Sequence, residues 1–355
     1  MPDIKGRRLG LPIIQGGMGV GVSLGGLAGS VAACGAMGVI SSANTGFAEP
    51  DFWREPLGAN MRTLEREIRR AKGLAAGRGL VGVNVMVATT QYPQAVQCAI
   101  RAGADAVICG AGLPLDLPGL AAEAGRDILL APIVSSGKAA RMICRRWDRD
   151  FGREPDFVVI EGSEAGGHLG FHWEELQSGT AKGLAQILAE VKQELLPIEQ
   201  KYGCTIPVFV AGGVYTAADA ERYLAAGAAG VQVATRFIAT YECDGSEAYK
   251  EIILGARPED VRLVQSPVGM PGRALWSPLL ERLQALGRLA PKHCVDCIKS
   301  CRPADTPYCI TKALVEAVRG NWQEGLFFCG SNVGRVNKML HVDELLHQLK
   351  PSIAF

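Results

Sequence analysis

The sequence contains no run of about 18 uncharged apolar residues, the length that a helix needs to cross a bilayer, so we expect no membrane span. Its first residues, MPDIKGRRLG, lack the apolar core of a signal peptide, and we therefore expect a cytoplasmic protein. An excess of one charge is also missing, because 37 Lys and Arg stand against 36 Asp and Glu. This balance argues against a nucleic-acid or membrane-surface partner. Tandem repeats, charge blocks and low-complexity linkers are absent as well.

Short apolar runs recur along the first two-thirds of the chain and alternate with amphipathic segments of helical spacing. Such alternation indicates a parallel sheet covered by helices. The runs are Leu11–Ile14, Ala36–Ile40, Leu80–Val87, Ala104–Ile108, Ile128–Val134, Phe157–Ile160, Ile206–Ala211 and Ala229–Val233. Eight strands in this arrangement favour a (β/α)8 barrel of the TIM type. A doubly wound open sheet is the alternative, since counting strands cannot show closure.

Two regions depart from the simple repeat and suggest the domain organisation. The long amphipathic segment 172–203 and the proline-containing helical region from about 240 to 291 are candidate lids. We therefore predict a TIM-type barrel over residues 1–240, with a helical insertion at about 172–203. Residues 241–355 would form a helical cap and a C-terminal extension.

The most informative segment is EGSEAGGHLG, residues 161–170. It follows the run Phe157–Ile160, which we interpret as a buried parallel strand. Gly166 and Gly167 permit close approach of the backbone to a ligand, because glycine has no Cβ. His168 adds an imidazole, whose pKa near neutrality suits proton transfer. His168 is thus the candidate catalytic residue, and an ordinary hydrogen-bonded loop histidine is the alternative for this motif taken alone.

Glycines also follow other predicted strands, in IIQGGMGVG (13–21) after the first and AGGV (211–214) after the seventh. In a barrel, the loops after strands seven and eight commonly bind phosphate through backbone N–H groups. The predicted phosphate cradle is therefore Gly212, Gly213, Ala234 and Thr235, with the Thr235 hydroxyl as a further donor. The alternative is that these glycines only join strands to helices.

Five segments between residues 11 and 237 carry a family resemblance: LPIIQGGMGVGVSLGGLAG, VGVNVM, EGSEAGGHLG, VFVAGGVYT and VQVATRF. Through them the chain resembles the nitronate monooxygenase family, formerly called 2-nitropropane dioxygenases. That family is related to the flavin-dependent enoyl-acyl-carrier-protein reductases. The resemblance implies an FMN-binding TIM-type barrel, and it is more specific for the superfamily than for the reaction.

The resemblance also implies which residues contact FMN. They are Gln15, Gly17 and Met18 along the isoalloxazine ring, Asn84 at the flavin or its ribityl chain, Ser135 or Ser136 at the end of the fifth strand, Gly166 and Gly167 at the border of the ring, and Gly212, Gly213, Ala234 and Thr235 at the phosphate. His168 matches the catalytic histidine of the family. A second glycine-rich turn, Gly325–Arg335, receives no assigned contact.

The implied reaction is the oxidation of nitroalkanes or nitronates to a carbonyl compound and nitrite, completed by oxygen. His168 would remove the α-proton of a neutral nitroalkane, or orient and charge-balance a nitronate. An alternative is an FMN-dependent enoyl-thioester reductase supplied with hydride by a nicotinamide nucleotide or another electron donor. A second alternative is a flavin-binding module without turnover. The substrate is expected to be a small molecule, and a homodimer is one assembly that the sequence leaves open.

Four of the eleven cysteines are crowded into one segment, in a C-x2-C-x3-C-x7-C array. They are Cys294, Cys297, Cys301 and Cys309. Four thiolates at short spacing can hold a 4Fe–4S cluster or a zinc ion, and the x3 and x7 gaps favour the cluster. His293 is an alternative ligand, and ordinary buried thiols are the alternative to metal binding. An iron–sulfur cluster would exchange electrons with FMN and would favour a reductive reaction.

Overall fold

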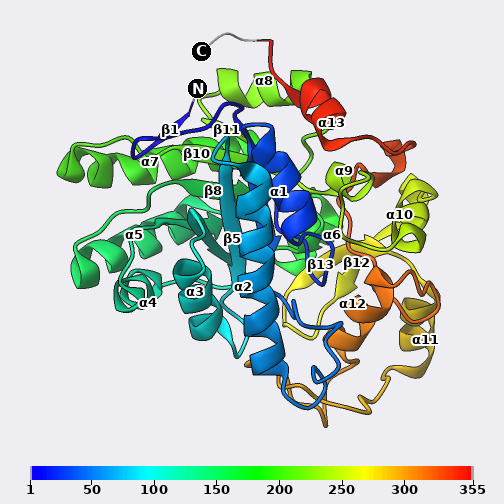
Figure 1. Cartoon of the computed structure of the whole chain (residues 1–355). Helices are drawn as coiled ribbons and strands as arrows, with labels where there is room; N and C mark the ends of the chain where they lie inside the picture. Colours follow the sequence, from blue (N-terminus) through cyan, green and yellow to red (C-terminus); the bar gives the residue numbers. More distant parts are fainter. Residues whose placement is uncertain (1, 353–355) are drawn as a thin grey trace.

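Eight parallel strands close into a barrel in the computed structural model, which describes residues 2–352 (Figure 1). The order around the barrel is β10-β11-β3-β4-β5-β6-β7-β8. The strands are β3 (Ile13–Gln15), β4 (Met37–Ser41), β5 (Leu80–Met86), β6 (Ala106–Gly110), β7 (Leu129–Val134), β8 (Val158–Glu161), β10 (Val208–Ala211) and β11 (Gly230–Val233). Each overlaps one of the apolar runs, so the TIM-type barrel is confirmed and the open sheet is excluded.

Helices connect successive strands and cover the outside of the barrel (Figure 1). They are α1 (Gly25–Ala33), α2 (Pro56–Ala75), α3 (Tyr92–Arg101), α4 (Leu117–Ala124), α5 (Gly137–Phe151), α7 (Leu184–Tyr202) and α8 (Ala217–Ala225). The short α6 (Trp173–Ser178) precedes α7. Local signals set their ends. For example, the Ser136 hydroxyl accepts from the Ala139 N–H at the start of α5, and Gly152 ends that helix at a φ of 58°.

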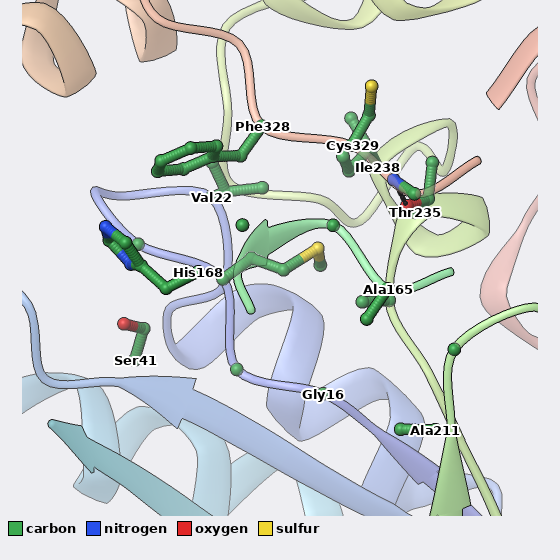
Figure 2. Close-up of a pocket in the computed structure, with 18 of the residues that line it drawn as sticks. Gly16, Val22, Ser41, Ala165, His168, Ala211, Thr235, Ile238, Phe328 and Cys329 are labelled. Atoms are coloured by element: carbon green, nitrogen blue, oxygen red, sulfur yellow. Dashed lines mark hydrogen bonds between the residues drawn. The ribbon is translucent and has the colours of Figure 1, made fainter. Parts of the chain in front are cut away.

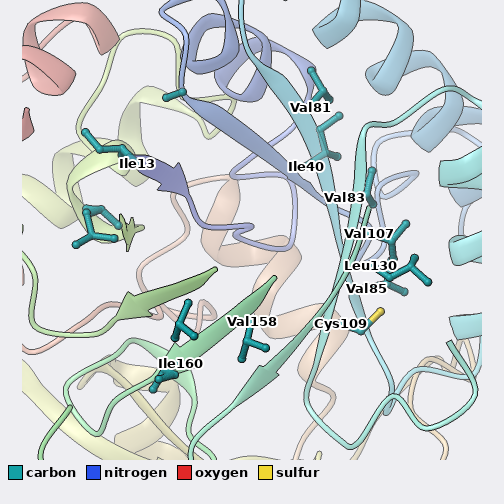
Figure 3. Packing of buried hydrophobic residues seen from close by; sticks show 14 of the residues in the cluster. Ile13, Ile40, Val81, Val83, Val85, Val107, Cys109, Leu130, Val158 and Ile160 are labelled. Carbon is teal, nitrogen blue, oxygen red and sulfur yellow. The ribbon is translucent and has the colours of Figure 1, made fainter. Parts of the chain in front are cut away.

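Apolar side chains form two layers, because successive residues of a barrel strand face opposite sides of the sheet. The outer layer lies between strands and helices and includes Ile13, Ile40, Val83 and Val107 (Figure 3). The inner layer fills the barrel, where Phe157 and Phe209 meet edge to face at 5.7 Å. The hairpin of β1 (Asp3–Ile4) and β2 (Arg7–Arg8) adds to this inner layer through Ile4.

The segment expected as a helical insertion divides into two helices with different surroundings. The longer one, α7, packs against α5 and contacts β8 and β10, so it is the regular connecting helix of the barrel wall and not a lid. The short α6 has no buried residue and follows the turn that carries His168. The apolar residues of α7 explain its place in the wall. They recur at helical spacing, and those residues, including Ile187 and Val191, are buried against the barrel.

Residues 235–352 form a layer over the carboxyl ends of the barrel strands and then return to the barrel wall. The elements are α9 (Thr235–Ile238), α10 (Glu247–Leu254), η1 (Pro258–Asp260), β12 (Val261–Gln265), β13 (Pro271–Leu275), α11 (Pro278–Leu286), α12 (Ile310–Val318), η2 (Val333–Arg335) and α13 (Val342–Leu349). This part is not purely helical as expected, because β12 and β13 form an antiparallel hairpin. Within residues 2–352, no helix combines the length and apolarity needed to cross a bilayer.

Candidate active site

A cavity of about 240 Å³ lies where the barrel strands end and the C-terminal layer covers them. Most of the residues predicted to contact a cofactor line it, together with the candidate catalytic residue. They are Gly17, Met18, Asn84, Gly166, Gly167, His168, Gly212, Gly213, Ala234 and Thr235. In Figure 2, His168 and Ser41 lie on one side of the cavity, and Thr235 and Cys329 lie on the other. The structure therefore brings together residues that are far apart in the sequence.

Gln15 and Ser135 are not among the residues that line this cavity. The Gln15 side chain is fully buried, and its Oε1 accepts from the Val39 N–H at 3.0 Å, so it ties β3 to β4. Ser135 also lies outside the lining, and its neighbour Ser136 is occupied as the cap of α5. The side chain of Gln15 therefore links two barrel strands, and that of Ser136 caps a helix of the barrel wall.

At one end of the cavity, backbone and hydroxyl groups make a site suited to phosphate. Gly212 and Gly213 have φ values of 96° and 80°, a conformation that favours glycine. The Thr235 Oγ1 accepts from the Gly330 N–H at 2.9 Å, which leaves its own hydrogen free for an anion. Arg236 lines the same cavity and adds a positive charge. All four residues of the predicted phosphate cradle thus line one cavity, and phosphate binding there stays a prediction.

Other helix N-termini near the glycine-rich loops already have their partners. The N–H groups of Leu24 and Leu27, at the start of α1, donate to the Asp244 carboxylate at 2.8 and 3.0 Å. At the start of α8, the Thr216 hydroxyl accepts from the Asp219 N–H. An anion at either terminus would have to displace a side chain that already satisfies the helix. This favours the Gly212–Thr235 end of the cavity as the phosphate site.

The other end of the cavity is lined by the loop after β3 and by polar residues near the ends of barrel strands. A Cβ added at Gly17 would lie 2.5 Å from the Asn84 Cβ, so the loop after β3 passes close to the end of β5. Several further polar residues line the cavity and were missed by the sequence reasoning, among them Ser41, Glu161 and Gln232. Each of these three lies at or next to the carboxyl end of a barrel strand. That position was the available signal, because active-site residues of such barrels gather at this face.

The Glu161 side chain forms neither a hydrogen bond nor an ion pair with any of the residues that the structure describes, 2–352. Glu161 ends β8, and burial raises its pKa to about 8. A carboxyl group with this pKa is mostly protonated at neutral pH and can donate a hydrogen bond. Glu161 therefore offers the cavity a neutral acid, suited to an acceptor atom of a ligand.

His168 lies on β9 (Gly167–His168), a short strand that pairs with β13 through Gly272. Its Nε2 lies 2.7 Å from the Ser266 Oγ, and its ring meets Phe328 edge to face at 5.1 Å. The Ser266 Oγ accepts from the Val268 N–H and can also accept from Nε2–H, and in that tautomer Nδ1 keeps the lone pair that a base needs. Burial lowers the pKa of His168 to about 4, so the ring is neutral over the physiological range.

The turn before His168 is held by Arg273 from β13. One guanidinium nitrogen of Arg273 donates to the carbonyl oxygens of Ser163 and Ala165, the latter at 2.7 Å. Residues 235–352, the layer over the strand ends, form the roof of the cavity. Within this roof, the N–H of Ser331 donates to the Glu164 carbonyl at 3.1 Å and joins the segment around Ser331 to the same turn. The predicted turn Gly325–Arg335 thus reaches back over the cavity. The position of His168 depends on contacts with residues about one hundred positions away.

The four clustered cysteines lie between α11 and α12, on the segment that joins these helices. Cys294 is exposed, and Cys297, Cys301 and Cys309 are half-buried. Burial raises the pKa of Cys297 to about 11, and the neighbouring thiols add smaller effects in the same direction. Across residues 2–352, no three His, Cys, Asp or Glu side chains are arranged to hold a metal ion. The structure therefore does not support the expected iron–sulfur or zinc site.

Comparison with known families gives a match over nearly the whole chain. The family described as nitronate monooxygenase matches residues 5–352. Among curated proteins, the (3aS,4S,5R,7aS)-5-hydroxy-7a-methyl-1-oxo-octahydro-1H-indene-4-carboxyl-CoA dehydrogenase of Rhodococcus jostii (strain RHA1) is 26% identical over 278 residues. A probable nitronate monooxygenase of Bacillus subtilis (strain 168) is 25% identical over 203 residues. The alignments cover 78% and 56% of this chain, but only 66% and 51% of those relatives.

Solved structures share the fold. FabK from Thermotoga maritima superposes with a TM-score of 0.70 at 24% sequence identity, over 96% of this chain and 92% of that one. A nitroalkane oxidase from Streptomyces ansochromogenes superposes with a TM-score of 0.71 at 22% identity, over 96% and 95% of the two chains.

Proposed function

The chain belongs to the nitronate monooxygenase family, a family of FMN-dependent oxidoreductases, and on this premise we propose that it oxidises nitronates and nitroalkanes to a carbonyl compound and nitrite. The observation that carries the proposal is the position of His168. Its imidazole lines a cavity whose far end offers a phosphate cradle, so a proton-transfer group and a cofactor site share one space. A passive binding module has no need of this combination.

The residues present fit FMN. Gly212, Gly213, Thr235 and Arg236 would hold the phosphate, and Asn84 and the protonated Glu161 would meet the polar atoms of the ring. The bound FMN would accept electrons from the substrate. The protein's part is to orient the substrate, to exclude water and to place a neutral imidazole beside the α-carbon.

The environment of His168 bears on the form of the substrate. A neutral imidazole can accept a proton, but a conjugate acid with a pKa of about 4 makes it a weak base. A nitronate arrives already deprotonated and needs only orientation from His168, whose neutral ring carries no balancing charge. We therefore expect nitronates to be used faster than their parent nitroalkanes.

An assay on the FMN-loaded protein tests this function directly. 1-Nitropropane, equilibrated beforehand to its nitronate, should bleach the flavin absorbance without oxygen and release nitrite in air. Neutral 1-nitropropane, added fresh, should react more slowly. If neither form bleaches the flavin, the proposed function is wrong.

A second candidate function is an oxidoreductase of acyl thioesters. It is favoured by the relative from Rhodococcus jostii, which is named as a carboxyl-CoA dehydrogenase. In that case a nicotinamide nucleotide would be the electron donor or acceptor. Oxidation of NADH that depends on added crotonyl-CoA, with no reaction of nitronates, would select this candidate over the first.

Ser266 is expected to act as a positioning residue for His168. Ser266→Ala removes the partner of Nε2, and one hydrogen bond is worth about 0.5–1.5 kcal/mol, so nitronate turnover should fall about three- to tenfold. Ser266→Thr keeps the hydroxyl and should restore most of the activity. Steady-state rates with both variants check this, and FMN content should be unchanged in each. Equal rates for Ser266→Ala and the wild type would remove Ser266 from this role.

The raised pKa of Glu161 predicts that FMN binding depends on pH. Its pKa of about 8 lies above the ordinary value, so the carboxyl is neutral below pH 8 and becomes a buried, unpaired charge as the pH rises through 8. FMN affinity should therefore weaken between pH 7 and 9. Fluorescence titration of FMN into the apoprotein measures this, with Glu161→Gln as the matched variant. A wild type and a variant with the same pH dependence would contradict the assignment.

A further inference from the structure

A second, smaller cavity of about 40 Å³ adjoins the first at the side of His168. The two cavities share five lining residues: Val20, Ala43, Met86, His168 and Leu314. A volume of this size holds about three or four non-hydrogen atoms, taking about 10–15 Å³ for each water-sized occupant. Its lining is largely apolar, and its remaining walls include Cys297 and Ile298. The cysteine array thus has a place beside the candidate active site.

The cysteine-rich segment, residues 293–309, is fixed to the loop between β5 and α3 by backbone contacts. Ile298 forms an isolated antiparallel bridge with Thr89, and the Cys297 carbonyl accepts from the Thr90 N–H at 3.2 Å. On the other side of the bridge, the Lys299 N–H donates to the Ala88 carbonyl at 2.9 Å. In Figure 1 this segment, between α11 and α12, runs along the edge of the molecule near the loop that follows β4. It therefore forms a fixed wall of the second cavity.

Polar residues of this cavity belong to a connected chain of neutral groups, which also includes Asn60 outside the lining. The Asn60 amide donates to Gln91 Oε1 at 2.9 Å and to Asn44 Oδ1 at 3.5 Å, and the Asn44 amide donates to Thr311 Oγ1 at 3.0 Å. Thr311 is in turn a hydrogen-bond neighbour of the Cys297 thiol. These bonds fix the orientation of the amides. Among residues 2–352, no Asp, Glu, Lys or Arg lines the cavity.

We propose that this second cavity is the subsite for the side chain of the substrate, and that Cys297 and Ile298 limit it to short, uncharged chains of about three or four non-hydrogen atoms. The proposal rests on the function proposed above. The nitro-bearing carbon lies beside His168, which belongs to both cavities, and the chain extends toward the cysteine-rich segment. A charged group would be buried there without an opposite charge, which is unfavourable, and a longer chain would meet Ile298.

The first experiment measures the reaction of single cysteines in the FMN-loaded protein. Only the methylthio end of methyl methanethiosulfonate, two non-hydrogen atoms, has to enter the cavity to reach the thiol. Peptide mass spectrometry follows Cys297 and Cys294 separately. Nitroethane and 1-nitropropane nitronates should slow labelling of Cys297 at least fivefold, and 1-nitrohexane nitronate should not. The exposed Cys294 lies on the same segment and serves as the internal control, because its labelling should not change.

The second experiment enlarges the subsite. Ile298→Ala should improve kcat/KM for 1-nitrohexane relative to nitroethane, at about fourfold for each methylene newly accommodated. Ile298→Val is the conservative variant and should give a smaller shift in the same direction. Ile252→Ala is the control, because Ile252 belongs to α10 and lines neither cavity. Dissociation constants measured by flavin difference spectra should follow the same order, which separates binding from turnover.

The outcomes separate this proposal from the proposed function. Protection of Cys297 that falls with chain length, without flavin bleaching, would retain the subsite and reject the reaction. Bleaching without protection of Cys297, and without a change of chain-length preference in Ile298→Ala, would retain the reaction and overturn the subsite. If Cys297 does not react in the free protein, the chain-length preference of the Ile298 variants decides the question alone.

Discussion

His168→Asn should lower turnover of a neutral nitroalkane by about 10²–10⁴-fold, the range expected when a proton-transfer group is removed. FMN should stay bound, because the side chain of His168 lies away from the phosphate end of the cavity (Figure 2). Turnover of the nitronate should fall less, since that substrate has already lost its α-proton. The measurement is kcat/KM for both forms of 1-nitropropane, with the flavin spectrum recorded on the same sample.

A pH profile and a matched variant make this prediction specific. The base must be neutral to act, and burial lowers the pKa of His168 to about 4, so activity should persist down to about pH 5 and fall only below it. His341→Asn changes an exposed histidine that pairs with Glu242, and it should leave the rates unchanged. Equal turnover of the neutral substrate in His168→Asn and the wild type would rule out the assigned role.

Gly166→Ala should weaken FMN binding by about 10- to 100-fold. A Cβ at this position would lie 2.5 Å from the backbone nitrogen of Gly330, and backbone cannot move aside as a flexible side chain can. Overpacking of this kind typically costs about 1–3 kcal/mol, and here it would separate the roof from the turn that borders the ring. Titration of FMN into the apoprotein gives the dissociation constant.

The control for Gly166→Ala is Gly183→Ala at the start of α7, where an added Cβ meets no atom within 4 Å. That variant should bind FMN as the wild type does. Thermal unfolding without FMN should also be compared, because Gly166→Ala acts at a junction between two parts of the fold. A dissociation constant for Gly166→Ala within twofold of the wild type would show that the roof does not shape the cofactor site.

The barrel was predictable from the sequence because its strands are buried on both sides. Such strands appear as short continuous apolar runs, and all eight of them were found in this way. The hairpin of β12 and β13 was not found. Its residues, such as Arg262 and Arg273, give a weak apolar signal, and the pairing of Gly272 with His168 spans about one hundred residues. Long-range pairing of this kind leaves no local pattern in one sequence.

The site was predictable where glycine marks a close approach of the backbone. Gly17, Gly166 and Gly212 were identified in this way, and all of them line the cavity. Ser266 was missed because a serine in a turn resembles many others, and only the folded hairpin brings it to His168. The cysteine array was interpreted from spacing alone. Spacing does not reveal that residues 293–309 pair with the loop after β5, as the structure shows.

The closure of the cavity by the segment from Phe328 to Asn332 has a consequence for the order of events during biosynthesis. A nascent chain emerges from the ribosome with its N-terminal part first, and the barrel strands end at Val233. The barrel can therefore form while the roof is still being translated. Gly330 must emerge before its N–H can meet Thr235. A flavin captured in this cavity would thus mark a polypeptide whose synthesis has passed Gly330, and chains that stop before this residue would be released colourless.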